Sequence, residues 1–444
     1  MQINIKETAV VRPVKPPFDH DHTLSLSHLD TDPNLLVTLR YLRVYSNEPN
    51  QQQADPFHVI IAALSSSLVR YYPFSGTLHR RHSDGRLELH CRAGDGVPVV
   101  RAAVDCPLSQ VNYLDADVDE TFADQLAPDP CQKEDLTRPM ILQVTRFNCG
   151  GFVLGAAIHH AICDGLGATL FFNAMAELAR GSGHMTIEPI WDRTKLLGPR
   201  DPPRLEFPIH EYLSLDKDFS PYTGSGKRVI KECFNVKDEW LDQLKGLLHK
   251  QSGLKFTTFE ALGAFIWRAR TLACKVPRNE KVTFAYSINI RRIVNPPLPA
   301  GYWGNGCVPM YIHLTADEVA EQPIWKTADS IKRSKHNATN EYVFSLIDFQ
   351  ELHYKEGISG GRRVSGFTDW RHLGHSTVDF GWGGPVSVVP LSRHLLGSLE
   401  PCFFLPGKEG MLRVLVHLEE DVILGFRKEM DNLKNLENGL QSAI

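Results

Sequence analysis

MILQVTRF at residues 140–147 and FVLGAAI at residues 152–158 are two apolar, partly β-branched runs. The four residues between them, NCGG at 148–151, include two glycines and are typical of a tight turn. This pattern predicts a β-hairpin. The second strand leads directly into His159-His160-Ala161-Ile162-Cys163-Asp164-Gly165, so a histidine pair stands at the end of a strand.

Helical patterns flank this hairpin on both sides. Downstream, apolar residues recur at helical spacing from Leu166 to Leu178, and we expect that helix to end near Arg180, before Gly-Ser-Gly. Upstream, Asp55-Pro56 is typical of a helix start, and apolar spacing continues to Arg70. Further on, the pattern predicts a helix over 258–270, strands over 282–288 and 412–418, and a solvated helix or tail over 427–444. Both halves are therefore expected to be mixed α/β.

The length of the chain favours two domains. At 444 residues it exceeds the size at which one hydrophobic core usually stops growing. A proline-rich segment, LGPRDPPRLEFP at 197–208, has the composition of a linker. We therefore predict an N-terminal domain over 1–196, a linker over 197–225 and a C-terminal domain over 226–444.

Composition narrows the classes of partner. The formal net charge of -4 gives no basis for a nucleic-acid partner, so small molecules are the expected ones. The nine cysteines include no C-x-x-C pair, which favours neither a zinc site nor a disulfide framework. The sequence shows no signal-peptide core and no apolar run of about 18 residues, so we expect a cytoplasmic protein without a membrane partner.

His160 is the candidate for chemistry. Neutral imidazole accepts a proton near neutral pH, which suits a general base presented at a strand end. Asp164, four residues later, could hold the ring or the loop, and Gly165 would permit a tight turn. A helical H-x-x-x-D pair could instead ligate metal, but this pair follows a strand and has no third ligand at metal-site spacing, so no metal is predicted.

Two segments together resemble a known family. His160 to Gly165 matches the H-x-x-x-D-G motif of the plant BAHD acyltransferases, and Asp379-Phe380-Gly381-Trp382-Gly383 is identical to their D-F-G-W-G motif. Their order and approximate spacing also match. Supporting matches span the chain: Tyr71 to Gly76, Thr257 to Glu260, Asn289 to Arg291 and Gly301 to Asn305.

The resemblance implies a fold and a reaction. Family members have two domains similar to chloramphenicol acetyltransferase, with a solvent channel between them. By this resemblance His160 takes a proton from an alcohol or amine acceptor as it attacks an acyl-CoA thioester in a ternary complex. Acyl-CoA is then a co-substrate, no cofactor is bound permanently, and a monomer is expected. Asp164 is expected to pair with Arg291 and to fix the loop that carries His160.

The resemblance also assigns supporting residues. Asp379, Gly381 and Gly383 would shape the channel, with the glycines allowing close backbone approach and Trp382 supplying a rigid surface or an oxyanion contact from its indole N–H. Thr257, Thr258 and Lys255 are expected to contact coenzyme A at a helix start. For the threonines, simple N-capping is the alternative.

One position in the sequence narrows the class of acceptor. Relatives that act on shikimate or quinate carry an arginine seven residues before the D-F-G-W-G aspartate, where this chain has His372. A neutral imidazole cannot form the bidentate pair that a guanidinium makes with a carboxylate. We therefore expect the hydroxyl of a small specialised-metabolite alcohol, with an amine or polyamine as the main alternative. His372 and Trp303 are the candidate acceptor-pocket residues.

Two other functions, and one modification site, are the alternatives to this interpretation. Gly357-Ile358-Ser359-Gly360-Gly361 matches the G-x-S-x-G pattern of serine hydrolases, but its polar surroundings are not those of a nucleophile elbow. A non-catalytic relative would bind acyl-CoA without turnover. Asn337-Ala338-Thr339 is a formal glycosylation sequon, interpreted as ordinary surface sequence.

Overall fold

The computed structural model describes residues 1–47, 55–115, 119–130, 137–207, 213–214, 228–354, 358–359, 364–391, 399–408 and 410–434. Two compact units divide the chain. The first comprises Met1–Pro202, Pro296–Gly306 and His372–Leu395, and the second comprises Pro203–Asn295, Cys307–Arg371 and Leu396–Ile444. The predicted C-terminal domain, 226–444, therefore loses two segments, 296–306 and 372–395, to the first unit. The sequence reasoning did not assign these two segments to the first unit, although prolines are also frequent at 296–299.

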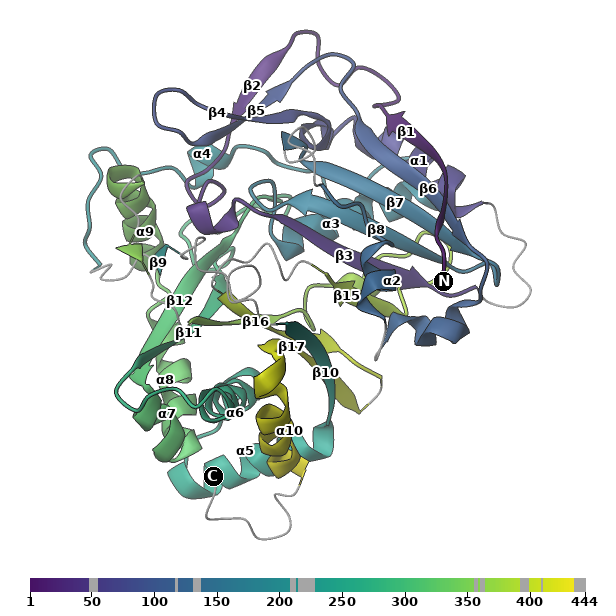
Figure 1. The fold of residues 1–444 in the computed structure, drawn as a ribbon. Coiled ribbons are helices and arrows are strands. Elements are labelled where there is room, and N and C mark those ends of the chain that lie inside the picture. Colours follow the sequence, from purple (N-terminus) through teal and green to yellow (C-terminus); the bar gives the residue numbers. More distant parts are fainter. Residues whose placement is uncertain are drawn as a thin grey trace. The chain divides into compact units, whose positions relative to one another are not determined.

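A six-stranded mixed sheet forms the centre of the first unit, in the order β1-β6-β7-β8-β3-β15. Its strands are β1 (Asn4–Val11), β3 (Thr38–Tyr45), β6 (Val97–Val104), β7 (Met140–Phe147), β8 (Phe152–His159) and β15 (Ser387–Pro390). Only β6 and β7 run parallel, and the other neighbours are antiparallel. Strand β15 arrives from the segment 372–395 and lies beside β3 (Figure 1).

The predicted hairpin is confirmed as β7 and β8. They pair antiparallel, with Met140 opposite Ile158 and Arg146 opposite Phe152, and Gly150 takes a φ of +84° in the turn. Every residue of β8 is buried, as expected of a central strand covered on both faces. This burial fixes the register, and the strand end that carries His159 is fixed with it.

The predicted helices of the first unit are also confirmed. Helix α1 (Pro56–Ser67) begins at Asp55, whose carboxylate accepts a hydrogen bond from the Phe57 amide at 3.1 Å. Helix α3 (Gly165–Ala179) begins directly after Asp164 and packs against α1. Two shorter helices complete this unit: α2 (Glu120–Asp124) and α4 (Arg193–Leu196).

A small three-stranded sheet, in the order β2-β5-β4, belongs to the first unit as well. Its strands are β2 (His22–Ser25), β4 (Thr77–Arg80) and β5 (Leu87–Cys91). Leu78 and Leu89 pair across it and are buried, while the intervening side chains are more exposed. This alternation is that of a sheet with one face on the core.

The second unit repeats the plan with another six-stranded mixed sheet, in the order β10-β17-β16-β14-β11-β12. Its strands are β10 (Val229–Lys237), β11 (Lys281–Asn289), β12 (Cys307–Thr315), β14 (Val364–Asp369), β16 (Leu399–Pro406) and β17 (Met411–Glu419). A separate parallel pair joins β9 (Leu213–Ser214) to β13 (Ile358–Ser359). The strands predicted over 282–288 and 412–418 are confirmed as β11 and β17.

Helices gather on one face of the second sheet (Figure 1). They are α5 (Asp238–Ser252), α6 (Thr258–Ala273), α8 (Ile324–His336) and α10 (Glu420–Lys434). Helix α7 (Ala316–Glu321) precedes α8 in the sequence, and α9 (Asn340–His353) follows it. Helix α6 is central, because it packs against α5, α8 and α10 and is the most buried. The predicted helix over 258–270 is thus confirmed. Helix α10 accounts for the start of the predicted tail, of which 435–444 lies outside the described residues.

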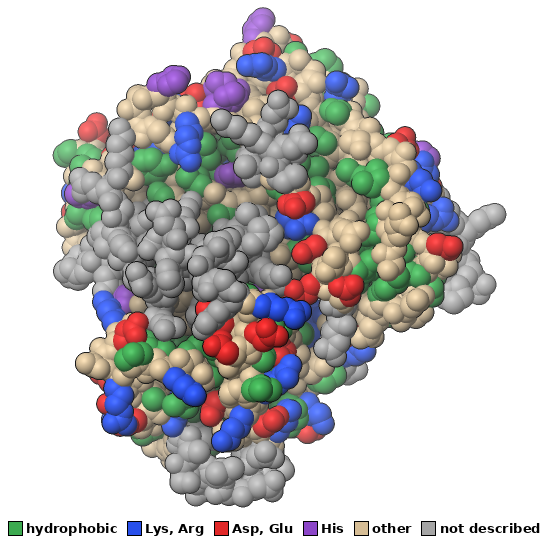
Figure 2. Space-filling model, in the orientation of Figure 1, with side chains coloured by type: hydrophobic (Ala, Val, Ile, Leu, Met, Phe, Trp, Pro, Cys, Tyr) green, Lys and Arg blue, Asp and Glu red, His purple; other side chains and the backbone are tan. Residues whose placement is uncertain are grey.

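The surface mixes charges of both signs. On the face drawn in Figure 2, basic and acidic side chains are interleaved over the described part of the chain. Exposed pairs such as Arg427–Glu232, at 2.7 Å, are examples of this pattern. Within the same part of the chain, no helix has the length and apolar character needed to cross a membrane.

Two helical glycines provide a test of the packing around α3. A Cβ at Gly167 would lie 2.1 Å from the Trp303 carbonyl oxygen, whereas a Cβ at Gly246, in α5, would meet nothing within 4 Å. Gly167→Ala should therefore lower the free energy of unfolding by about 1 to 3 kcal/mol, and Gly246→Ala should raise it by about 0.5 to 1 kcal/mol. Urea unfolding of both variants checks this. Equal effects of the two substitutions on the free energy of unfolding would contradict the close approach of the Trp303 carbonyl to α3.

Candidate active site

The loop between β8 and α3 carries the candidate base, and its backbone is held at the start. The His160 amide donates to the Val37 carbonyl at 2.8 Å, and the Ile162 amide donates to the His159 carbonyl at 3.0 Å. His159 is buried, and its Nδ1 accepts from the Ala161 amide at 3.2 Å. His160 is partly exposed. Of the two adjacent histidines, the structure therefore makes His159 a loop-building residue and leaves the His160 ring for chemistry.

Asp164 holds the other end of this loop. It is buried, and its two carboxylate oxygens accept different backbone amides: Gly167 at 2.8 Å and Gly306 at 2.9 Å. The first bond caps α3, and the second ties the loop to the segment 302–306. Asp164 therefore holds the loop and not the ring. Its expected pairing with Arg291 stays a prediction, because Arg291 belongs to the second unit.

The environment of His160 favours the neutral ring. Burial lowers the pKa of His160 from its ordinary value of 6.5, while the Asp164 carboxylate, hydrogen-bonding interactions with the backbone and Asn305, and Asp30 act in the opposite direction. Among the described residues, its buried Nδ1 makes no aligned hydrogen bond. A neutral imidazole is suited to accept a proton.

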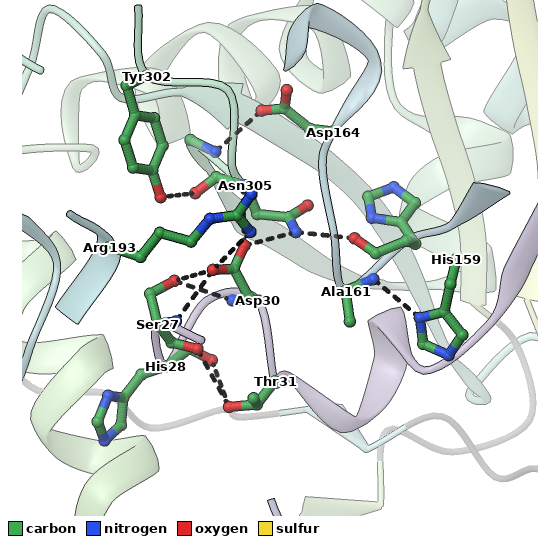
Figure 3. Close-up of polar contacts among 12 residues, drawn as sticks. Ser27, His28, Asp30, Thr31, His159, Ala161, Asp164, Arg193, Tyr302 and Asn305 are labelled. Atoms are coloured by element: carbon green, nitrogen blue, oxygen red, sulfur yellow. Dashed lines mark hydrogen bonds and ion pairs between the residues drawn. The ribbon is translucent and has the colours of Figure 1, made fainter. Parts of the chain in front are cut away.

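Three polar residues beside the loop were missed by the sequence reasoning: Asp30, Arg193 and Asn305 (Figure 3). All three are buried, and Asn305 donates to the His160 carbonyl at 2.8 Å. In the sequence, Asn305 stands out only as the last residue of Gly301 to Asn305, which resembles the family. The one available signal was Ser27-x-x-Asp30, a spacing typical of local side-chain to backbone hydrogen bonds. Nothing in the sequence marked Arg193.

The D-F-G-W-G motif lies at the other end of β8. The Trp382 ring packs edge-on against Phe152, with centroids 5.1 Å apart, and Phe152 is the first residue of β8 while His159 is the last. Seven residues of strand span about 23 Å at about 3.3 Å per residue. The indole N–H therefore cannot reach an oxyanion beside His160, and this suggested role of Trp382 is corrected to packing.

The rest of the motif fixes its own loop to the first unit. Asp379 accepts from the Gly381 amide at 2.7 Å, and its carbonyl accepts from Arg180. Gly381 and Gly383 take φ values of +106° and +76°, and a Cβ on either would meet nothing within 4 Å. Left-handed backbone therefore accounts for glycine at both positions, and their expected role in shaping the channel stays a prediction.

The two candidate acceptor-pocket residues differ in exposure. Trp303 is 1% exposed, and its ring packs against Tyr71, Phe74 and Trp191, so it cannot touch a substrate and its role is corrected to packing. His372 is exposed, and its neighbour Leu373 would lie 2.8 Å from a Cβ at Gly165. His372 therefore stands beside the start of α3. The same contact shows that Gly165 makes room for Leu373.

The nearby Arg371 has a partner of its own. Its guanidinium binds the Asp369 carboxylate through Nε at 2.9 Å and Nη2 at 2.6 Å. A guanidinium held bidentately by a carboxylate is not available for an acceptor carboxylate. This contact agrees with the expectation that a carboxylated acceptor is disfavoured.

The predicted coenzyme A residues lie at the start of α6 in the second unit. Thr257 caps this helix: its hydroxyl accepts from the Glu260 amide at 3.3 Å, and the Glu260 carboxylate accepts from the Thr257 amide at 2.8 Å. The capping alternative is confirmed for Thr257. Thr258 is partly exposed and Lys255 is exposed, so both remain accessible. Their contact with coenzyme A stays a prediction.

The hydrolase pattern has little structural support. Gly357, Gly360 and Gly361 lie outside the described residues, and Ser359 ends the two-residue strand β13. The next described element is the strand β14, whereas a nucleophile elbow requires a helix. In the sequon, Asn337 is exposed and Thr339 caps α9.

The fold has two sheet-rich units, and the candidate base, His160, follows the end of β8. Residues 1–433 match the family described as Transferase family. The chain is 33% identical to a spermidine coumaroyl-CoA acyltransferase from Arabidopsis thaliana, over 98% of this chain and 96% of the relative. It is 30% identical to a taxadien-5-alpha-ol O-acetyltransferase from Taxus chinensis, over 97% of each.

A comparison of structures confirms the fold. Vinorine synthase superposes with a TM-score of 0.75 at 22% identity, covering 96% of each chain. The predicted mixed α/β fold with two acyltransferase domains is therefore confirmed. The chain belongs to the Transferase family, that is, to the plant BAHD acyltransferases.

The lowered pKa of His160 can be measured without a substrate. Below its pKa the ring is protonated and cannot accept a proton, so a lowered value keeps the base competent to lower pH. We expect the ¹³Cε1 resonance of His160, assigned by its loss in His160→Gln, to titrate with a midpoint below 6.5. His375, whose pKa is lowered to about 3 by burial and by Arg43, should stay neutral through this range. A His160 midpoint at or above the ordinary value would contradict the site described.

Proposed function

We propose that the chain transfers an acyl group from an acyl-CoA thioester to the hydroxyl of a small specialised-metabolite alcohol, with His160 as the general base. The observation that carries this proposal is the His160 ring itself. Its backbone is tied on both sides, its Nδ1 makes no aligned hydrogen bond within the described residues, and its pKa is lowered. Only the imidazole is left to act.

The reaction balances with one base. His160 takes the proton of the acceptor O–H as the oxygen attacks the thioester carbonyl carbon. The tetrahedral intermediate collapses, the C–S bond breaks, and the imidazolium returns the proton to the departing thiolate. The products are the ester and free coenzyme A. Alignment of two bound substrates supplies the remaining advantage, and no covalent enzyme intermediate is needed.

The start of α6 is the proposed contact for coenzyme A. A helix N-terminus carries a partial positive charge that favours phosphate groups. Thr258 stands at the first helical position, Lys255 lies just before it, and Lys332 donates to the Lys255 carbonyl at 2.9 Å. These cations suit the phosphates of coenzyme A. The solvent channel expected from the family stays part of this proposal.

An alcohol acceptor is favoured by the charges around His160. Asp30 and Asp164 are the carboxylates that act on its pKa, and both accept hydrogen bonds from buried groups. Neither offers a free counter-charge to a cationic amine. With His372 in place of the arginine and Arg371 bound to Asp369, a shikimate or quinate acceptor is the least favoured.

Transfer to an amine is the second candidate. Spermidine is the acceptor in the name of the relative that is 33% identical over nearly the whole chain, and a second spermidine acyltransferase is equally similar. The same histidine would serve, because an uncharged amine also loses a proton on acylation. This candidate differs from the first only in the acceptor pocket.

A substrate panel tests both candidates. Acetyl-, benzoyl- and coumaroyl-CoA are each offered with aliphatic and terpenoid alcohols, a flavonoid glycoside, spermidine and shikimate, and thiol release and product mass are followed. We expect esters from a neutral alcohol. Amides from spermidine would select the second candidate. Acyl-CoA binding without thiol release would indicate a non-catalytic relative and refute the proposal.

His160→Ala is the direct test of the base. It should lower turnover of the best pair by about 10²- to 10⁴-fold while the fold is retained. Trp382→Phe is the control for the indole, because it keeps an aromatic ring beside Phe152 and removes the N–H together with the second ring of the indole. It should turn over at close to the wild-type rate. An active His160→Ala protein would refute the assigned base, and an inactive, folded Trp382→Phe protein would restore the oxyanion role.

An active Ser359→Ala protein would separately exclude a serine hydrolase. A cytoplasmic monomer remains part of the proposal, and sedimentation of the purified chain checks its oligomeric state.

A further inference from the structure

A buried polar cluster lies directly behind the His160 loop in the first unit, formed by Asp30, Arg193 and Asn305 (Figure 3). None of the three is more than 1% exposed. They come from distant parts of the sequence: the segment before β3, helix α4, and the segment 296–306. Burying charged and amide groups is costly unless they are paired. Here Asn305 is hydrogen-bonded to Asp30, and Arg193 is paired with Asp30 by charge. The question is what this cluster holds.

Asn305 is the link between the cluster and the loop. Its side-chain amide donates twice, to the Asp30 carboxylate at 2.9 Å and to the His160 carbonyl at 2.8 Å. Its backbone amide donates to the same Asp30 oxygen at 2.9 Å. The next residue, Gly306, donates to Asp164 at 2.9 Å. Two consecutive residues thus hold both ends of the loop from His160 to Asp164.

Asp30 anchors Asn305. Beyond the two bonds from Asn305, its other oxygen accepts from the Ser27 amide at 3.0 Å and the Ser27 hydroxyl at 2.8 Å. The same oxygen lies 3.1 Å from Nη1 of Arg193. The carboxylate is therefore saturated and cannot rotate without breaking several charge-assisted bonds.

Arg193 pairs with Asp30 and is itself held by two aromatic rings. Its guanidinium lies 3.8 Å from the ring centroid of Trp191 and 4.8 Å from that of Trp303. Both rings are flat, rigid surfaces, so the cation is held in place by stacking as well as by Asp30. A buried ion pair is a poor device for stability alone, which makes a specific positioning role the better explanation here.

We propose that Asp30, Arg193 and Asn305 are positioning residues for the base: together they fix the His160 carbonyl and so set the direction of its imidazole. The inference rests on the proposed function of His160. The backbone N–H of His160 is already bound to Val37, so the bond from Asn305 completes the fixation of that residue. Displacing a catalytic group by about 1 Å can lower the rate of the catalysed step by roughly 10²-fold.

This role predicts a particular kinetic signature. None of the three side chains is exposed, so none touches a substrate. Loss of the Asn305 bond should therefore lower kcat and leave KM for acyl-CoA unchanged. The loss should also depend on His160, because a side chain that acts only through the imidazole has nothing to orient once the ring is gone.

The experiment is a double-mutant cycle with the acyl donor and acceptor that turn over best. Asn305→Ala should lower kcat by about 10- to 100-fold. In a His160→Ala background the same change should have almost no effect. Asn47→Ala is the matched control, because that amide donates to the Cys149 carbonyl, in the turn at the opposite end of the hairpin, at 3.3 Å. It should keep wild-type kcat.

A swapped variant keeps the test valid if Asn305→Ala does not fold. Asp30→Asn combined with Asn305→Asp retains the side-chain volumes and the total charge of the cluster, and it replaces the donor to the His160 carbonyl by a carboxylate oxygen. It also replaces one of the two acceptor oxygens of residue 30, which bind the amides of Ser27 and Asn305, by an NH2 group. It should fold and lose kcat as Asn305→Ala does. Wild-type kcat in the swap, or an equal loss from Asn305→Ala with and without His160, would overturn the positioning role. Failure of the base assignment is separate, because it would appear as activity in His160→Ala alone.

Discussion

The site depends on one carboxylate that receives two backbone amides. Asp164 binds the Gly167 amide in the first turn of α3 and the Gly306 amide in a segment nearly 140 residues later. One side chain therefore sets where the helix begins and where the returning segment lies. A neutral side chain could satisfy one amide, but a carboxylate binds both with the strength of charge-assisted bonds. The loop carrying His160 has no freedom left between these ties.

Gly167 explains why the two segments can come so close. The Trp303 carbonyl approaches α3 at the position where any Cβ would stand, so this helix accepts only glycine there. The aromatic cluster around Trp303 holds that carbonyl in place. Trp303 thus acts on packing behind the loop.

Much of the fold could be predicted because its signals are local. The hairpin β7–β8, the Asp55 and Thr257 caps and the apolar spacing of α3 and α6 are each contained in twenty residues or fewer. The candidate base could be proposed for the same reason, since a strand, His160 and Asp164 are contiguous. The return of segments 296–306 and 372–395 to the first unit could not be predicted, because it depends on contacts between residues far apart in the sequence. Asp30 and Arg193 were missed on the same grounds.

The two signature motifs then have different physical roles, although the family resemblance groups them. His160 to Gly165 contains the proposed base. Asp379 to Gly383 closes a loop at the other end of β8, where Phe380 packs on Tyr45 and the Tyr45 hydroxyl donates to the Val378 carbonyl at 3.1 Å. This contact delivers β15 to the edge of the sheet beside β3. Because β15 covers that edge, β3 is an internal strand of the sheet. Val37, which directly precedes β3, accepts the hydrogen bond from the His160 amide. A motif about 23 Å away along β8 thus supports the base through the sheet.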